Sequence, residues 1–462
     1  MMDKDDMLFS SPSPGKRKNF LLTNRFGVAI IRNKNMCSLY CRKEMKPMSR
    51  VILHVDANCF YASVECLYHP ALRAHPVAVC GDPEARHGIV LTANYAAKRR
   101  GVQVGQAVWQ AKSVCPGLVT VPPHYDLYVH FSRMMRQMWE EYSDRVEAFG
   151  LDESWIDVSR DGMDVRQGAL LADRLRERVK RELGITVSIG VADNKVFAKL
   201  GSDMKKPDGT TAIDPASFRR TVWPLPARDL LYVGPSAARR LARLCIYTIG
   251  DLARADRGLL QATLGKNGLL LQSFALGLDV SPVMPVTAQE TVKSIGNSTT
   301  TPRDIETSED AKCVCALLSE SVAARLREHG LKAQCVSVSA RTVALATASC
   351  QAVLSAPTDL TGQIFRAAWG LFQGRFMASL PLRSMGVSCS RLSPADAPAQ
   401  LCFADDPASL ARQAELDRAI DDLRRRYGHN VVQRGVVLEN AAFSHLKPKE
   451  DHTIHPVPFF AG

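Results

Sequence analysis

The sequence predicts a multidomain protein that combines helices with β-sheets, and three features support this fold class. The chain has 462 residues, which is more than one domain usually contains. From Val51 onward, short β-branched runs alternate with segments of helical periodicity. Beyond Pro285, longer runs alternate apolar with small polar residues, as half-buried strands do. These features are typical of α/β or α+β folds.

Residues 1–47 have no sustained periodicity and include the linker-like run SSPSPGKRK. They contain ten basic and four acidic residues, and so they hold half of the formal net charge of +12. We expect this segment to be a disordered basic tail, or to precede the true start of translation. Because residues 48–462 are only mildly basic, charge alone does not establish a nucleic-acid partner.

The first folded region is expected to contain short strands separated by helices. The strands are predicted at 51–55, 77–80, 88–92, 119–121, 146–149, 154–158 and 187–191. The helices are predicted at 60–67, 94–100, 125–140, 167–183 and 194–204. A second region, 215–285, consists of short helices interrupted by glycines.

A third region begins with a polar, threonine-rich stretch at 286–307, which is expected to contain a linker and the first strand. A capping box at Thr307–Asp310 begins a helix, and Gly330 marks its end. Runs 335–341 and 385–390 are predicted to be half-buried strands with one small, polar, partly basic face, and a last helix is predicted at 407–427. The capped helix carries an apolar stripe at helical spacing, formed by Ala311, Cys315, Leu318, Val322 and Leu326.

Cysteine usage and hydropathy favour a cytoplasmic protein. Thirteen cysteines are scattered along the chain, and the close pairs Cys37/Cys41 and Cys313/Cys315 lack a second pair at zinc-site spacing. We expect most cysteines to be small buried residues in a reducing compartment. No apolar run approaches the roughly 20 residues that span a bilayer, so no membrane association is expected.

An acidic residue ends the first predicted strand, within VILHVDANCFYASVE. A buried unpaired carboxylate is costly, so Asp56 either caps the next helix or faces a cation. A hairpin predicted in VEAFGLDESWIDVS places Asp152 and Glu153 at or beside its tip. An adjacent acidic pair on a turn is usually only solvated, but separate strands can bring these carboxylates to one sheet edge. Such an oxygen-rich cluster suits two Mg²⁺ ions in nucleotidyl transfer.

Residues that could bind a triphosphate lie in two further motifs. Tyr95 and Lys98 share a short predicted helix in TANYAAKRRGV, and Lys206 precedes a Pro-Asp-Gly turn in SDMKKPDGT. Taken alone, each lysine is more often surface charge than ligand. Together with the carboxylates, these residues favour a site for a nucleoside triphosphate.

Five motifs resemble those of the Y-family translesion DNA polymerases, especially the bacterial DNA polymerase IV group. They are HVDANCFYASVE, LTANYAAKRRGV, FGLDESWIDV, VSIGVADNKVFAKLGSDMKKPDGT and KSIGNSTTTPRDIET, in the order and spacing of the family. The resemblance implies an α+β multidomain fold shaped as a right hand. It divides the chain into a palm (48–59 and 124–212), small fingers (60–123), a helix-hairpin-helix thumb (213–285), a linker and little finger (286–395) and a C-terminal extension (396–462).

The resemblance also implies a metal centre. Asp56 and Asp152 would hold both Mg²⁺ ions, with the Ala57 carbonyl as a further ligand. Glu153 would complete the site near the primer 3′-hydroxyl.

The same resemblance implies how the nucleotide is bound. Tyr95, Lys98 and Lys206 would contact the triphosphate. Tyr61 would lie beneath the sugar as a steric gate against a 2′-hydroxyl, with Phe60 packed beside it. Without the resemblance, Phe60 and Tyr61 would simply be core aromatics.

The chain departs from the family pattern at several positions. Asn58 stands where many relatives have an acid, and it is expected to be a helix N-cap. Lys98 stands where many relatives have an arginine, so a single ammonium group replaces a guanidinium that can form two parallel hydrogen bonds to a phosphate. In the thumb, YVGPSAARRL keeps only part of the glycine-rich hairpin. Gln400, Leu401 and Phe403 resemble a sliding-clamp-binding peptide, although an ordinary amphipathic linker is an equal alternative.

We expect a monomeric, template-directed DNA polymerase of low fidelity that adds dNTPs to a primer on primer–template DNA. One alternative is a DNA-binding accessory factor in repair with weakened catalysis, which the presence of Asp56, Asp152 and Glu153 disfavours. A second alternative is a base-excision enzyme, which would need a catalytic lysine or aspartate just after the helix-hairpin-helix. The run YTIGDLARAD supplies acidic residues there, but this alternative would leave the palm motifs unexplained.

Overall fold

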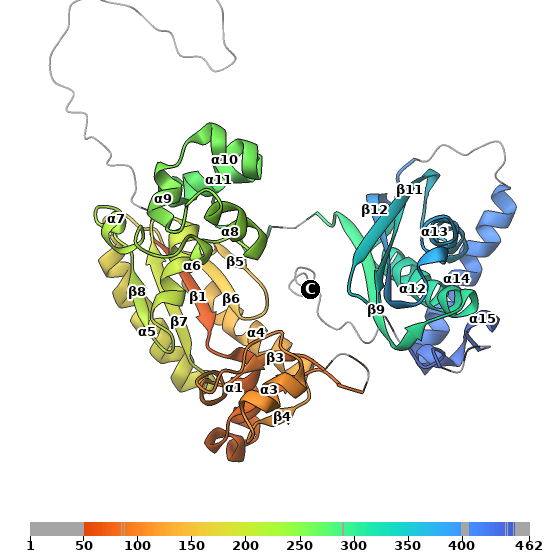
Figure 1. Cartoon of the computed structure of the whole chain (residues 1–462), viewed down its shortest axis with the longest axis horizontal. Helices are drawn as coiled ribbons and strands as arrows, with labels where there is room; N and C mark the ends of the chain where they lie inside the picture. The colour runs from red at the N-terminus through yellow and green to blue at the C-terminus, as the bar shows by residue number, and fades with distance from the viewer. Residues whose placement is uncertain are drawn as a thin grey trace, which may run out of the picture. The chain divides into compact units, whose positions relative to one another are not determined.

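The computed structural model describes residues 50–84, 86, 88–288, 291–398, 406–438, 440, 442–446 and 448. The predicted tail at 1–47 and the predicted clamp-binding residues Gln400, Leu401 and Phe403 lie outside these ranges. The described residues form three β-sheets, each covered by its own helices (Figure 1).

A five-stranded sheet contains the strand that ends near Asp56. Its order is β5-β6-β1-β7-β8, with β1 antiparallel to β6 and β7, and with β7 parallel to β8. Every residue of the two central strands β1 and β7 is buried, so this sheet is the centre of one hydrophobic core. The strands are β1 (Ile52–Ala57), β5 (Val146–Ala148), β6 (Glu153–Asp157), β7 (Val187–Ala192) and β8 (Thr210–Ala212).

Two helices pack on β7, namely α5 (Val165–Leu183) and α6 (Lys195–Met204). The backbone of α6 comes so close to Gly190 that a Cβ atom there would overlap the Ala198 carbonyl oxygen. Only glycine allows this approach. It brings the side chains of α6 close to the strands that carry the acidic residues.

A three-stranded sheet of order β3-β2-β4 forms a smaller core next in the sequence. The long helix α4 (Tyr125–Glu140) follows it and packs against α1 and β5. The elements before α4 are α1 (Phe60–Tyr68), the 3₁₀ helix η1 (Pro70–Ala74), β2 (Val77–Cys80), β3 (Val90–Ala93), α2 (Tyr95–Lys98), α3 (Val108–Val114) and β4 (Val119–Val121).

A run of short helices follows β8, as the glycine-broken pattern predicts. Thr248 caps α9 with a capping box to Asp251, and Asp256 caps α10. The helices are α7 (Phe218–Thr221), η2 (Ala227–Asp229), α8 (Pro235–Ala242), α9 (Ile249–Arg254), α10 (Arg257–Leu264) and α11 (Lys266–Ala275).

A four-stranded antiparallel sheet of order β11-β10-β12-β9 forms a separate core with α12 and α13. Thr307 caps α12 through the predicted box with Asp310, and the predicted apolar stripe of this helix is buried. The elements are β9 (Ser294–Ile305), α12 (Ser308–Glu328), β10 (Leu331–Thr342), β11 (Thr347–Thr358), α13 (Thr361–Arg375), η3 (Met377–Ser379) and β12 (Leu382–Pro394).

The C-terminal helices belong to the same core as this sheet. The elements are α14 (Pro407–Tyr427), η4 (His429–Val431) and α15 (Gly435–Leu438). Val437 and Phe443 are fully buried against α12 and the strands. The predicted boundary between 395 and 396 therefore divides residues that share one hydrophobic core.

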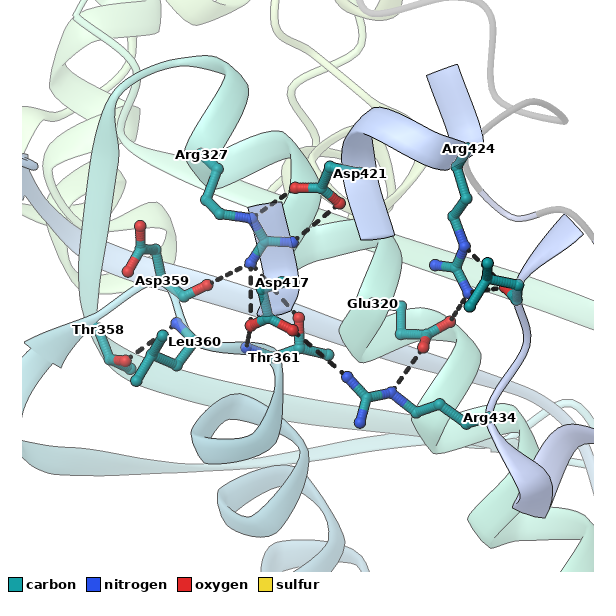
Figure 2. A network of polar contacts seen from close by, with 11 residues as sticks. Glu320, Arg327, Thr358, Asp359, Leu360, Thr361, Asp417, Asp421, Arg424 and Arg434 are labelled. Atoms are coloured by element: carbon teal, nitrogen blue, oxygen red, sulfur yellow. Dashed lines mark hydrogen bonds and ion pairs between the residues drawn. The ribbon is translucent and has the colours of Figure 1, made fainter. Parts of the chain in front are cut away.

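Buried charges hold α14 to this domain (Figure 2). Glu320 of α12 is 4% exposed and accepts hydrogen bonds from Arg424 at 3.0 Å and from Arg434 at 2.6 Å. Asp417 of α14 is 5% exposed and accepts from the Thr361 backbone N–H at 2.8 Å. Each buried carboxylate therefore has donors that offset the cost of removing it from water.

An arginine of α12 also holds α14 to this domain. Arg327 of α12 donates to both carboxylate oxygens of Asp421, at 2.6 and 3.1 Å, and to the Asp359 carbonyl oxygen at 2.7 Å. Its guanidinium also lies 3.4 Å from Asp417. A bidentate pair of this kind fixes the direction of α14 as well as its attachment.

The structure confirms the secondary structure predicted for the first region, with element ends that differ by at most two residues. The short elements α3 and β8 were not predicted. Eight of the ten cysteines in the described ranges are buried, and all ten are free thiols. Within the same ranges, no helix combines the length and apolar character needed to cross a bilayer.

Asp417→Ala should loosen α14. The substitution leaves the Thr361 N–H and part of the Arg327 charge without a buried acceptor, at a cost of about 2 kcal/mol. Hydrogen–deuterium exchange of α14 should become faster, and the unfolding midpoint of this domain should fall.

Asp422→Ala is the matched control on the same helix, because its side chain is 57% exposed and forms a surface pair with Arg425. It should change stability by less than about 0.5 kcal/mol. Equal exchange in the two variants would show that the buried network does not hold the helix.

Candidate active site

Three carboxylate-bearing residues meet at one edge of the five-stranded sheet. Asp56 of β1 lies directly opposite Glu153 of β6 in the antiparallel register. The Ala57 N–H donates to the Asp152 carbonyl oxygen at 3.0 Å, so the hairpin turn is joined to the end of β1. The structure thus confirms that β5 and β6 form a hairpin with Asp152 in its turn and Glu153 at the start of β6.

Burial and the crowding of like charges shift the protonation of Asp152. Burial raises the pKa of Asp152 to about 7, and the neighbouring charges of Glu153 and Asp56 act in the same direction. Asp56 itself is buried, with only 4% of the residue exposed. The sheet edge therefore holds more negative charge than it can stabilise without a cation.

Lys199 on α6 supplies part of that positive charge. Its ammonium lies 2.8 Å from Glu153 Oε2 and 3.2 Å from Asp56 Oδ2. Sequence reasoning missed this residue. The available signal was a lone lysine between apolar residues in VFAKLGS, where Ala198 and Leu200 are both buried.

Lys206, at the end of the same helical segment, contacts Asp56 from another side. Its ammonium lies 2.7 Å from Asp56 Oδ2 and 2.8 Å from Asp203 Oδ1. Burial opposes its charge, but contact with Asp56 and Asp203 prevails and raises the pKa of Lys206 above its ordinary value. Asp203 also lies 3.4 Å from Lys199, so two lysines and two aspartates form a closed ring of alternating charge.

A buried histidine lies beneath Glu153. Burial lowers the pKa of His54 well below its usual value, and the Lys199 charge acts in the same direction, so the imidazole is neutral. The Ser202 hydroxyl lies within hydrogen-bond distance of both the Lys199 carbonyl oxygen and His54 Nδ1, which is 2.9 Å away. The other ring nitrogen, Nε2, lies 3.2 Å from Glu153 Oε2. That carboxylate oxygen consequently depends on Lys199 for compensation.

The donor set fits a divalent metal ion by its chemistry. Carboxylate oxygens from separate strands, one of them with a strongly raised pKa, are the hard ligands that such ions prefer. Among the described residues, no three acidic, histidine or cysteine side chains already converge closely enough to enclose an ion. The ammonium group of Lys199 instead lies between Asp56 and Glu153, where a cation is required.

The prediction that Asn58 caps α1 is wrong. The N-cap is Cys59, which turns the chain through a left-handed conformation with φ 49° and has no side-chain cap. Asn58 is instead buried beside the sheet, where its Oδ1 accepts from the Tyr95 hydroxyl at 3.2 Å and from Ser188 at 3.0 Å. A capping side chain accepts a hydrogen bond from a backbone N–H in the first turn of its helix. The Asn58 side chain instead accepts from Tyr95 on α2 and Ser188 on β7.

The Asn58 contact connects α2 to the acidic edge. Tyr95 begins α2, whose N-cap Asn94 accepts from the Ala97 N–H at 3.0 Å. The Lys98 ammonium lies 5.3 Å from the centroid of the Tyr95 ring. Tyr95 thus contacts the residue that follows β1, and Lys206 contacts Asp56 on β1. Contact of Tyr95, Lys98 and Lys206 with a triphosphate stays a prediction.

An aromatic cluster occupies the other side of the turn after β1. The rings of Tyr61 and Tyr128 stack with centroids 4.1 Å apart and an angle of 9° between their planes. Tyr125 meets Tyr61 edge-on at 6.1 Å. Burial raises the pKa of Tyr61, and the Asp152 charge acts in the same direction, so Tyr61 lies near the carboxylates. Phe60 is 2% exposed and packs in the core beneath them.

Comparison with known proteins adds an independent finding. Family models match at residues 55–203, described as the impB/mucB/samB family, and at residues 292–402, described as its C-terminal domain. A DNA polymerase IV of Acetivibrio thermocellus is 47% identical over 399 residues, which cover 86% of this chain and 100% of that protein. A DNA polymerase IV of Moorella thermoacetica is 39% identical over 84% of this chain and 96% of its own length.

A solved structure supports the fold. A Y-family DNA polymerase chimera superposes with a TM-score of 0.66, covers 74% of this chain and 98% of its own, and shares 24% sequence identity. At that identity the likeness concerns the fold alone. It agrees with the α+β multidomain architecture that the sequence predicts.

Proposed function

Because the chain belongs to the DNA polymerase IV family of Y-family DNA polymerases, we propose that the acidic edge at β1 and β6 is its nucleotidyl-transfer centre. The protein is a translesion DNA-directed DNA polymerase, and its substrates are DNA and deoxynucleoside triphosphates. The alternative of an accessory factor with weakened catalysis is not favoured. The observation that carries the proposal is the pairing of Asp56 with Glu153 next to Asp152.

The domains follow from the same premise. We assign the five-stranded sheet with α5 and α6 to the palm and the three-stranded sheet to the fingers. The run of short helices from α7 to α11 would be the thumb, and the four-stranded sheet would be the little finger. The packing of Val437 and Phe443 supports including the C-terminal helices in the little finger.

Family membership implies dependence on divalent metal ions, and we propose that two Mg²⁺ ions are bound here. Asp56 and Asp152 would hold both ions with the Ala57 carbonyl, and Glu153 would lie near the primer 3′-hydroxyl. When bound, such ions activate the attacking hydroxyl and neutralise the leaving pyrophosphate. The raised pKa of Asp152 supports the proposal, because a nearby cation would stabilise the carboxylate.

Lys206 would have one partner in the free protein and another when the nucleotide is bound. In the free protein, Lys206 neutralises Asp56 at 2.7 Å. With the nucleotide bound, Lys206 would turn to the triphosphate, while Asp203 at 2.8 Å keeps it near the site. Tyr95 and Lys98 would contact the same triphosphate from α2. Lys199 would remain as a positive charge beside Glu153.

We also propose that Tyr61 is the steric gate and that Phe60 supports it from the core. The nearness of Tyr61 to Asp152 supports this role, because a nucleotide bound at the carboxylates would place its sugar over the adjacent turn. The stacked Tyr128 ring leaves Tyr61 little freedom to move away.

We further propose that the enzyme acts as a cytoplasmic monomer that a sliding clamp makes more processive. Gln400, Leu401 and Phe403 would bind the clamp. The support is the resemblance of this segment to clamp-binding peptides and its position between β12 and α14.

Asp56→Asn and Asp152→Asn should each reduce nucleotide addition by roughly 10³-fold, because a lost metal ligand removes several kcal/mol of transition-state stabilisation. Primer–template binding should change little. Primer extension with Mg²⁺ and four dNTPs, together with a DNA-binding titration, measures both effects.

Asp173→Asn is the control for these variants, because this carboxylate is 51% exposed on α5 and should leave extension unchanged. Full-rate extension by Asp56→Asn or Asp152→Asn would remove the proposed metal centre.

Tyr61→Ala should allow ribonucleotide insertion while deoxynucleotide insertion falls much less. Shrinking the ring removes the clash with a 2′-hydroxyl and touches no carboxylate. The ratio of kcat/KM for dNTP to that for the matching rNTP should fall at least about 100-fold. A ratio equal to that of the parent protein would show that the gate lies elsewhere.

Replacing Gln400, Leu401 and Phe403 together with alanine should abolish stimulation by the clamp. Basal extension without the clamp should be unchanged, because none of the three residues is assigned a role in metal or nucleotide binding. Extension with and without the clamp on a long primed template measures both effects. Undiminished stimulation would show that these three residues do not bind the clamp.

A further inference from the structure

A buried acidic residue lies one helical turn beyond Tyr61 and takes no part in the chemistry described above. Glu65 is 1% exposed and lies on the same helix, α1. Residues four apart on a helix share a face, so Tyr61 and Glu65 both face the element that packs there. That element is α4.

Glu65 binds two groups at the start of α4. Its Oε1 accepts from the Tyr128 hydroxyl at 2.5 Å and from His124 Nδ1 at 2.9 Å. The Tyr128 hydroxyl in turn accepts from the His124 backbone N–H at 3.1 Å. The hydroxyl is therefore fixed by one bond that it donates and one that it accepts.

The other end of Tyr128 contacts Tyr61. The two rings are stacked at 4.1 Å and nearly parallel, while Tyr125 closes the cluster edge-on at 5.9 Å from Tyr128 and 6.1 Å from Tyr61. Tyr128 is fully buried. Its ring can therefore shift only if its hydroxyl leaves Glu65.

We propose that Glu65 is a positioning residue for sugar selection. Through the Tyr128 hydroxyl it fixes the surface on which the Tyr61 ring rests, and so it sets how closely that ring approaches the nucleotide sugar. The inference rests on the proposed role of Tyr61 as the steric gate.

Two physical arguments favour this role over a merely structural one. A buried carboxylate is costly, and an apolar side chain would fill the same space without that cost. Exclusion of a 2′-hydroxyl depends on the exact position of a ring, and a displacement of about 1 Å can change a rate roughly 100-fold. A directed hydrogen bond fixes position more strictly than apolar packing does.

The test measures the preference for dNTP over the matching rNTP, as a ratio of kcat/KM values, in the full chain. Tyr128→Phe keeps the ring and removes the anchored hydroxyl, and Glu65→Ala removes the anchor. Both should lower the preference roughly 10- to 100-fold, mainly by improved rNTP insertion. Glu65→Gln, which keeps an acceptor oxygen, should retain most of the preference.

A double variant that combines Glu65→Ala with Tyr61→Ala distinguishes an effect on the position of the Tyr61 ring from a general loss of stability. If Glu65 acts through Tyr61, Glu65→Ala should cause no further loss of preference in the Tyr61→Ala protein. Met135→Ala is the matched control, because Met135 is buried in the same core on α4 and should lower stability without changing the preference.

The outcomes are distinct. An unchanged preference in Tyr128→Phe and Glu65→Ala, with a reduced preference in Tyr61→Ala, would overturn the inference and leave the gate intact. An equal loss in Met135→Ala, or an additive loss with Tyr61→Ala, would also overturn it. If Tyr61→Ala itself kept the preference, the gate would be refuted, and this inference with it. Tyr128→Phe decides the matter if Glu65→Ala does not fold.

Discussion

The five-stranded sheet and its helices depend on holding several negative charges at one edge of the sheet. Asp56 and Glu153 are fixed opposite each other by the register of β1 and β6, and Asp152 is fixed by its backbone bond to Ala57. Burial disfavours the charged form of Asp152, and repulsion from Glu153 and Asp56 acts in the same direction, so the pKa of Asp152 rises to about 7. A strand edge built in this way is stable only with positive charge beside it.

In the free protein that positive charge comes from lysines on and just after α6. Lys199 and Lys206 both contact Asp56 Oδ2, at 3.2 and 2.7 Å, and both also contact Asp203. The close approach of α6 to Gly190 keeps these lysines near the sheet. Because each lysine has a second acidic partner, either can leave Asp56 without becoming an isolated charge. In the proposed site, the same residues would stabilise the carboxylates of the free protein and release them when substrate binds.

The sequence predicted the regular elements and the acidic edge, but not the side-chain contacts across elements. The order of strands and helices and the hairpin at Asp152 follow from local periodicity. The partners of Asn58 and Lys199 depend on which segments pack together, and no local pattern records this. The three-residue strand β8 was missed because only its pairing with β7 makes it a strand. Likewise, one family motif contains both Tyr61 and Glu65, whereas the contacts of these residues with Tyr128 emerge only from the packing of α4 on α1.

The polar network beneath α14 has an evolutionary consequence. Arg434 contacts both Glu320 and Asp417, so a change at any one of the three leaves a buried charge of opposite sign without a full partner. Removing one member of such a set costs far more than replacing all of them with apolar residues. Along a lineage these positions must therefore be exchanged as a group, and every single step away from the present set passes through a less stable protein.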